Sequence, residues 1–295
     1  MTFRSQLRAL LIRAAILVRA EDVALRLQSR RARGVVVAIH ETPVALENQF
    51  RDQLEWVSRH FMISDLNSFI QQLRNPESHP GLKPPILFTF DDGRKSNYQV
   101  AAPLLESFGG RGVFFIVPAF AECSPATAFD FYRTKINPDA KPGDETRADW
   151  TPMTPAQIAE LAARGHAIGN HTLAHARLAG LSAEELEREI ADGARKLASW
   201  INQPAESFAW TFGWDSIDPR ALQVIQRHHR FCFAPCAGMI DARHGLPVLF
   251  WRREIEVKYA PAEYRFLYSG LADLWWSTRR RRLRKMLQVS HSNHG

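Results

Sequence analysis

Short apolar runs alternate along the chain with longer segments in which apolar residues recur every three or four positions. The runs are rich in β-branched and aromatic residues and have the length of buried strands, whereas the longer spacing is typical of helices that pack one face on a core. The predicted strands are 35–39, 86–90, 113–117, 166–169, 207–212, 231–234 and 251–257. The predicted helices are 50–60, 65–73, 97–107, 155–164, 182–200 and 219–229.

Residues at the expected helix ends agree with this division. Ser182 and Glu185 form a capping-box pattern, Pro155 and Pro219 stand where first helical turns accept proline, and Gly165 follows a helix end. Strands that are each followed by a helix favour a parallel sheet. We therefore predict an α/β protein built on a distorted (β/α) barrel of about seven strands, with an amphipathic extension at each end.

The barrel pattern covers residues 35–260, and the flanking segments differ from it. Residues 1–34 form a basic amphipathic arm, in which Arg8 and Arg13 interrupt the apolar run 7–18. Because no long uninterrupted apolar run follows, we expect neither a cleaved signal peptide nor a membrane-spanning helix.

Residues 261–295 form an aromatic tail that ends in an arginine-rich run, 279–285. For both terminal segments two interpretations stay open, namely packing or solvation as part of the domain and peripheral contact with an anionic membrane surface.

Charge narrows the range of partners. Lys and Arg number 38 against 31 Asp and Glu, which gives a net charge of +7, and the run 279–285 alone holds six of the positive residues. The remainder is near neutral, so we expect no nucleic-acid partner. The three cysteines cannot all pair within one chain, which favours a reducing compartment. We accordingly predict a cytoplasmic protein that is peripheral on the inner face of the membrane.

One long segment, 121–153, breaks the alternation and is rich in Pro, Asp, Ala and Thr. Loops of this length are usually functional or disordered. Its aromatic residues Phe129, Phe131, Tyr132 and Trp150 favour an ordered loop near a ligand, with a simple insertion as the alternative.

Candidate chemistry lies where two predicted strands end. The strand 86–90 runs into Asp91, Asp92 and Gly93, and the strand 166–169 precedes His171 and His175. Carboxyl ends of barrel strands meet around one mouth, where loops converge on a common site. A turn at Gly93 can bring both carboxylates toward that site. If the second segment is helical, the two imidazoles share one face and can share a metal ion.

One carboxylate and two imidazoles form a typical catalytic zinc set that leaves a position open for water. A second carboxylate beside such a set can take the proton when water attacks a carbonyl group. The pattern therefore predicts that one aspartate is a metal ligand and the other is a general base.

The segments TFDDG (89–93) and HTLAH (171–175) resemble the first two signature motifs of the NodB-homology polysaccharide deacetylases, carbohydrate esterase family 4. Three further segments resemble blocks of that family in order, and the resemblance spans roughly residues 35–257. They are VVVAIHETP, FRDQLEWVSRHFMISDLNSFI and NYQVAAPLLESFGGRGVFFIVPAF.

The resemblance implies a distorted (β/α) barrel that removes N-acyl groups, usually acetyl, from the amino sugars of glycans. By position, Asp92, His171 and His175 would bind one divalent metal, with Zn²⁺ as the favoured ion. Asp91 would be the catalytic base. Thr172 lies between the ligands in sequence and would help to orient them.

Two departures from the family pattern leave roles open. The third motif, commonly Arg-x-Pro-x-Gly, aligns with 209–213, where the arginine and proline are absent. Arg94, Arg252 and Arg253 are alternatives for orienting Asp91.

The histidine of the last motif is also unplaced. His40, at the end of the first strand, is the candidate general acid, with a structural role as the alternative. Trp210, Trp214 and Arg253 are candidates for substrate contact, although the two tryptophans could instead serve packing.

The leading hypothesis is a metal-dependent hydrolase acting on an N-acylated amino sugar of a glycan or of a lipid-linked saccharide. The alternative is a catalytically impaired deacetylase-like protein that binds a glycan or a membrane. The intact DD and HxxxH pattern favours the first, and the missing arginine favours the second.

Overall fold

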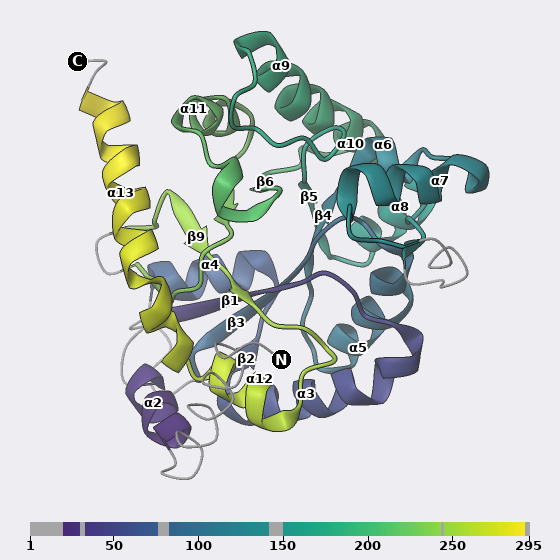
Figure 1. Cartoon of the computed structure of the whole chain (residues 1–295). Helices are drawn as coiled ribbons and strands as arrows, with labels where there is room; N and C mark the ends of the chain where they lie inside the picture. The colour runs from purple at the N-terminus through teal and green to yellow at the C-terminus, as the bar shows by residue number, and fades with distance from the viewer. Residues whose placement is uncertain (1–19, 30–32, 76–82, 142–149, 243–244, 293–295) are drawn as a thin grey trace.

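A parallel β-sheet forms the centre of the computed structural model, which describes residues 20–29, 33–75, 83–141, 150–242 and 245–292 (Figure 1). Its strands are β1 (Arg33–Ile39), β2 (Met62–Ile63), β3 (Pro85–Phe90), β4 (Val113–Ile116), β5 (Ala167–Asn170), β6 (Ser207–Ala209), β7 (Phe231–Ala234), β8 (Ile240–Asp241), β9 (Leu249–Trp251) and β10 (Arg253–Glu254).

The strand order is β10-β1-β3-β4-β5-β6-β7-β9, and every pairing along this path is parallel. β2 adds to β3, and β8 pairs antiparallel with β1. The two ends of the path, β9 and β10, are separated in sequence by Arg252 alone. The eight-stranded sheet therefore nearly closes on itself at this residue, which confirms the predicted distorted barrel.

Helices lie between successive strands as predicted. They are α3 (Glu47–His60), α4 (Leu66–Arg74), α5 (Ala102–Ser107), α8 (Pro155–Ala163), α9 (Ala183–Glu187), α10 (Gly193–Ile201) and α11 (Pro219–His228). The capping box of Ser182 and Glu185 is present, and Pro155 and Pro219 open their helices. Two predicted helices contain a π-helical turn, η3 (Asn97–Ala101) and η7 (Arg188–Asp192).

Both faces of the central strands are buried. In β1, Val35, Val37 and Ile39 belong to one apolar cluster, and Val36 belongs to a second cluster on the opposite face. This explains why the strands read as continuous apolar runs, since side chains that point into the barrel alternate with side chains that pack under the helices.

The described part of the segment 121–153 is ordered and mostly helical, whereas the sequence predicted an ordered loop. It contains α7 (Pro125–Phe131) and η4 (Tyr132–Ile136), which follow α6 (Pro118–Ala121). Its aromatic side chains pack in a cluster of their own, and the ring centroids of Phe129 and Trp150 lie 5.0 Å apart. That packing gives the segment a small core, which a pattern of loop-forming residues does not reveal.

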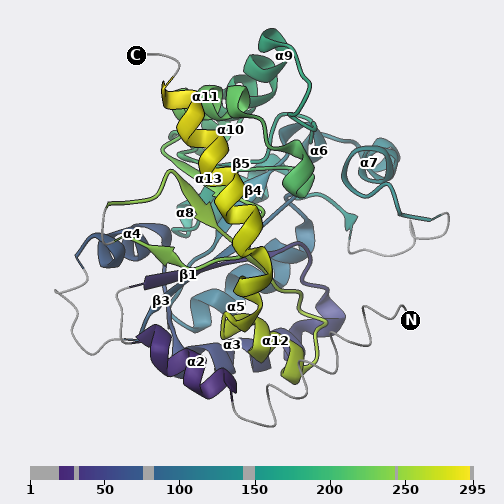
Figure 2. The ribbon, with the colours of Figure 1, turned by 60° about the vertical axis from the view of Figure 1, so that its left-hand side comes forward.

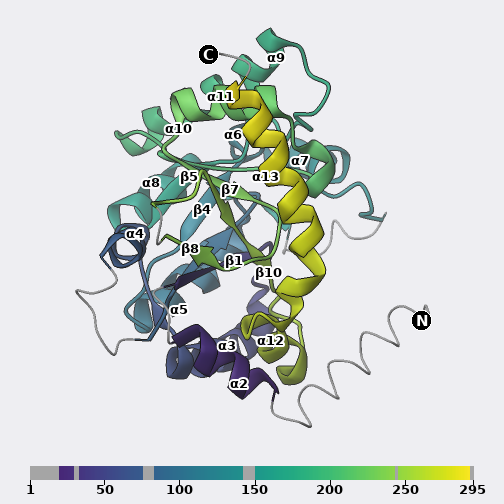
Figure 3. The same ribbon diagram turned by 90° about the vertical axis from the view of Figure 1, so that its left-hand side faces the viewer.

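The C-terminal segment packs on the barrel. It comprises α12 (Pro261–Tyr268), η9 (Leu271–Trp276) and α13 (Ser277–Ser292). Tyr268 joins the first apolar cluster and Leu283 joins the second. α13 lies on the outside of the domain in all three ribbon views (Figures 1, 2 and 3).

Of the predicted N-terminal arm, the structure describes α2 (Ala20–Ser29), and residues 1–19 lie outside the described part. Among the described residues, no helix combines the length and the apolar character needed to cross a bilayer.

Candidate metal centre and catalytic site

Strand β3 delivers the paired aspartates to the mouth of the barrel. The backbone N–H of Asp91 still donates to Ile39 O of β1, at 3.2 Å, and the chain then turns through left-handed φ angles of 72° at Asp92 and 77° at Gly93. Such φ angles are uncommon for residues other than glycine. The turn separates the two carboxylates, so that each meets a different set of partners.

The two histidines follow β5 in a bent loop, and the conditional expectation of a helical HxxxH face is wrong. Left-handed φ angles of 62° at Thr172 and 56° at His175 fold the loop back, and the imidazole centroids lie 5.2 Å apart. Thr172 Oγ1 accepts a hydrogen bond from the N–H of Ala176, at 2.9 Å, and so braces the loop.

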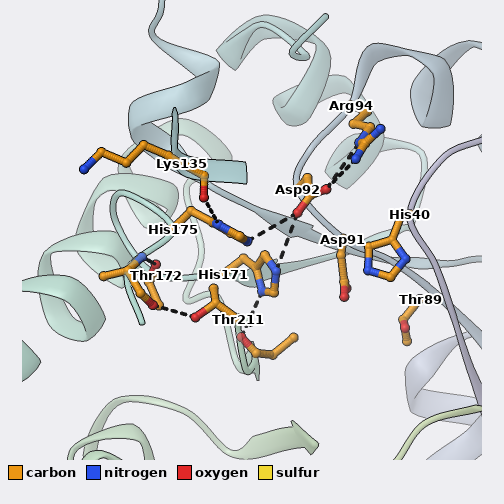
Figure 4. Close-up of polar contacts among 12 residues, drawn as sticks. His40, Thr89, Asp91, Asp92, Arg94, Lys135, His171, Thr172, His175 and Thr211 are labelled. Atoms are coloured by element: carbon orange, nitrogen blue, oxygen red, sulfur yellow. Dashed lines mark hydrogen bonds and ion pairs between the residues drawn. The ribbon is translucent and has the colours of Figure 1, made fainter. Parts of the chain in front are cut away.

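The two imidazoles converge on Asp92 (Figure 4). Nε2 of His171 and Nε2 of His175 lie 3.8 Å and 3.6 Å from Asp92 Oδ1. The opposite ring nitrogens donate to backbone carbonyls, from His171 Nδ1 to Ala209 O at 2.9 Å and from His175 Nδ1 to Lys135 O at 2.6 Å. These bonds fix the tautomer that leaves both Nε2 lone pairs free for a ligand.

The donor set fits a divalent metal. Tetrahedral zinc bonds of about 2.0–2.2 Å separate neighbouring ligand atoms by roughly 3.4 Å, close to the observed distances. Burial lowers the pKa of His171 to about 4, so its imidazole is neutral at pH 7. Burial alone would raise the pKa of Asp92, but the charge of Arg94 lowers it below its ordinary value. His171 and Asp92 thus favour their metal-binding protonation states.

Asp91 lies beside this group and is held by Arg252. Arg252 Nη1 donates to Asp91 Oδ1 at 2.6 Å and to Thr89 Oγ1 at 3.2 Å. Both charged residues are almost completely buried. Burial alone would raise the pKa of Asp91, but the nearby charge of Arg252, with a smaller contribution from His40, lowers it. Asp91 therefore stays ionised and oriented.

The other two candidate arginines have different partners. Arg94 donates from Nε and Nη2 to Asp92 Oδ2, at 3.2 Å and 3.1 Å. Arg253 donates to both carboxylate oxygens of Asp273, at 3.1 Å and 2.7 Å, and to Tyr268 O at 2.7 Å. Of the three alternatives, Arg252 is thus the one that orients Asp91.

His40 follows β1 directly and lies beside Asp91 (Figure 4). Its Nδ1 lies 2.9 Å from Glu256 Oε1 and 4.0 Å from Glu254 Oε1. Burial alone would lower the pKa of His40, but the hydrogen bond with Glu256 and the charge of Asp91 raise it well above its ordinary value. A protonated imidazole is therefore held next to the carboxylate pair.

A cavity of about 730 Å³ unites these groups. Its lining includes seven of the candidate site residues, namely His40, Asp91, Asp92, His171, His175, Trp210 and Arg253. A cavity of this size suits a small-molecule ligand or a few sugar units.

The predicted substrate-contact residues have limited reach into this cavity. Trp210 is 2% exposed and its indole N–H donates to Cys232 Sγ at 3.1 Å. Trp214 packs against the second apolar cluster and is not among the lining residues. The donors of Arg253 hold the C-terminal segment. The substrate role of Trp210, Trp214 and Arg253 therefore stays a prediction.

Sequence reasoning missed several lining residues, among them Glu41, Ile136, Glu256, Trp275 and Trp276. Glu256 follows Arg252 in a predicted strand with alternating charged residues, a signal that could have identified it. The two tryptophans come from the C-terminal segment, and their approach to the cavity depends on how that segment folds back.

Comparison with known proteins agrees with this geometry. Residues 79–229 match the family model described as polysaccharide deacetylase. One curated relative is a putative polysaccharide deacetylase, YxkH, of Bacillus subtilis, which is 24% identical over 43% of this chain and 37% of that protein. Another is a peptidoglycan-N-acetylglucosamine deacetylase of Bacillus cereus, which is 26% identical over 40% of this chain and 42% of that protein. The matches thus span well under half of either relative.

Solved structures share the fold at low sequence identity. The deacetylase PplD of Streptococcus pyogenes, in complex with acetate, has a TM-score of 0.59 at 18% identity, over 80% of this chain and 97% of that one. IcaB of Ammonifex degensii has a TM-score of 0.60 at 16% identity, over 82% and 97%. With a family model that matches about half of its length and with this fold around the paired motifs, the chain belongs to the polysaccharide deacetylase family.

Proposed function

We propose that the protein is a metal-dependent hydrolase that removes an N-acyl group, with N-acetyl favoured, from an amino sugar. The single observation that supports the proposal most strongly is that the two neighbouring aspartates have different partners. Asp92 faces His171 and His175, while Asp91 faces the cavity and is held by Arg252. A ligand set and a free, ionised base thus share one site, as hydrolysis of an amide requires.

The ligand set would hold one divalent ion, with Zn²⁺ favoured by its two imidazoles and one carboxylate. When bound, such an ion supplies Lewis acidity that polarises an amide carbonyl and makes water more acidic. The chain's contribution is to align the three ligands through Ala209 O, Lys135 O and Arg94.

Asp91 accepts a proton from the attacking water as the new C–O bond forms at the acyl carbon. Contact with Glu256 keeps His40 protonated. His40 then donates a proton to the sugar nitrogen as the C–N bond breaks. The products are a carboxylate and a free amine. Because Arg252 provides the positive charge that the altered third motif lacks, the structure favours this proposal over a catalytically impaired protein that binds a glycan or a membrane.

The experiment measures amine release from N-acetyl and N-formyl amino sugars by the purified full chain, with metal content determined in parallel. Asp91→Asn keeps the shape of the side chain and removes the base. We expect a rate lower by about 10²–10⁴-fold with metal content unchanged. Full activity in Asp91→Asn would refute the assigned base.

The proposal also includes a carrier for the sugar, which is either a polymer or a membrane lipid. It places the protein in the cytoplasm. The three cysteines are free thiols, in keeping with the reducing compartment that the sequence predicts.

A further inference from the structure

The C-terminal segment forms one wall of the active-site cavity. Its residues in the cavity lining come from α12 and η9 and are Leu267, Ala272, Asp273, Trp275 and Trp276. The mouth of the site therefore includes an apolar wall that the barrel strands do not supply.

Part of η9 is exposed beside that wall and forms its rim. Leu274 is 73% exposed and Trp275 is 49% exposed, although both side chains are large and apolar. Trp275 also contacts the ring of Phe266, with centroids 5.5 Å apart, so its orientation is supported from below. An exposed leucine next to an exposed tryptophan at a cavity mouth is typical of a surface that binds a membrane or another apolar partner.

The rim is held rigidly on the barrel. Arg253 donates to both carboxylate oxygens of Asp273, at 3.1 Å and 2.7 Å, and Arg280 donates to Asp273 O, at 2.8 Å, and to Ala237 O. These contacts fix η9 before any partner arrives, so little ordering is required on binding.

A cationic surface continues directly from this rim. α13 begins at Ser277, immediately after Trp276, and turns Leu283 inward. Its exposed positive side chains are Arg279, Arg281, Arg282, Arg284 and Lys285. Within the described part of the chain, no acidic side chain forms an ion pair with Arg281, Arg282 or Lys285. We call this surface the basic face of α13.

We propose that the rim of η9 and the basic face of α13 together dock on an anionic phospholipid bilayer, with the active-site mouth turned toward the lipid. Tryptophan and leucine enter the interface while guanidinium and ammonium groups meet phosphate headgroups. α13 runs along the outside of the domain (Figures 2 and 3). A nucleic acid would use the cations but would leave Leu274 without a role, so the bilayer accounts for more of the surface.

The consequence for the substrate rests on the proposed function. A sugar that is anchored in the membrane reaches a site whose mouth lies at the lipid surface without leaving the interface. The substrate class that this orientation favours is therefore an N-acylated amino sugar attached to a membrane lipid.

The test is co-sedimentation of the full chain with vesicles of phosphatidylcholine alone or mixed with phosphatidylglycerol. We expect binding to the anionic vesicles that weakens as salt rises. Arg281→Gln, Arg282→Gln and Lys285→Gln combined should lower the partition coefficient about 100-fold, since each cation contributes roughly 5-fold.

Two further variants separate the parts of the surface. Leu274→Ser should weaken binding roughly 5-fold through lost apolar burial. A matched control neutralises three exposed arginines that do not line the cavity and should bind as the unmodified protein does. It combines Arg74→Gln, Arg188→Gln and Arg195→Gln.

Equal binding by the triple variant and its matched control would overturn the proposal, and so would negligible binding of the unmodified protein. Binding of a DNA duplex as tight as that of vesicles, and lost in the same triple variant, would overturn it in favour of a nucleic-acid partner. Vesicle binding is measured without turnover, so failure of the deacetylase proposal leaves this result interpretable. Conversely, hydrolysis of water-soluble amino sugars should be unchanged in the triple variant.

Discussion

Two adjacent arginines offer a matched test of how the base is oriented. Arg252 and Arg253 both have nearly buried side chains, at 3% and 2% exposure, and each donates to a carboxylate. Arg252 holds Asp91, whereas Arg253 holds Asp273 in the C-terminal segment. Replacing each by glutamine removes the same charge from neighbouring positions of the chain, but only Arg252→Gln removes a hydrogen bond to Asp91.

The structure sets the expected magnitudes. Removing one partner of a buried ion pair costs about 3–5 kcal/mol of stability, so both variants should unfold more easily. A hydrogen bond to a charged group contributes about 1.5–3 kcal/mol. If that contribution orients Asp91 in the transition state, its loss in Arg252→Gln lowers kcat roughly 10- to 150-fold. Arg253→Gln should keep kcat near the original value per folded molecule, and loss of its predicted substrate contact should appear as a higher KM.

The assay combines kcat with thermal unfolding and metal content for both variants. Metal content should stay normal in Arg252→Gln, since Arg252 contacts Asp91 and not Asp92. Arg252→Ala with added guanidinium ion should recover part of the lost rate, because the ion can occupy the vacated site. Equal loss of kcat per folded molecule in the two glutamine variants would refute the reasoning.

Three other changes test separate parts of the structure. His175→Ala should abolish metal retention and activity, and chelation of the unmodified protein should mimic it until Zn²⁺ is restored; normal metal content in the variant would contradict the ligand assignment. Glu256→Gln removes the charge that raises the pKa of His40, so His40 loses its proton at lower pH and the alkaline limb of the kcat profile should move to lower pH. An unmoved limb would argue against His40 as the acid. Gly34→Ala would place a Cβ 2.6 Å from two ring atoms of Phe69, and denaturant titration should show about 1–3 kcal/mol less stability; an unchanged midpoint would mean that the ring moves aside freely.

Local patterns in the sequence predicted most of the barrel. Continuous apolar runs identified six strands, β1, β3, β4, β5, β6 and β7, because both faces of a parallel sheet are buried. The predicted strand 251–257 is wrong as a single element, because the chain forms β9 and β10 on either side of Arg252. The short strands β2 and β8, two residues each, carry too few positions to show any periodicity. The helical content of 121–153 was also missed, since its order depends on packing among its own aromatic rings.

The proposed ligand set could likewise be predicted from the sequence, because Asp92, His171 and His175 follow strands whose carboxyl ends meet. The path of the loop was not. Left-handed φ angles at Thr172 and His175, and not helical periodicity, bring the imidazoles together. Such angles are stabilised by contacts made elsewhere, such as His175 with Lys135 O.

Sequence alone therefore determined the strand pattern and the chemical types at the strand ends, since both depend on residues close together in the chain. Tertiary structure decided which arginine holds Asp91 and which aromatic residues border the cavity. Arg252 reaches Asp91 from 161 positions away because the barrel closes at the junction of β9 and β10. Trp275 and Trp276 reach the mouth because α12 and α13 pack back on the barrel. Contacts between such distant residues depend on closure and packing of the whole domain, and no local pattern encodes them.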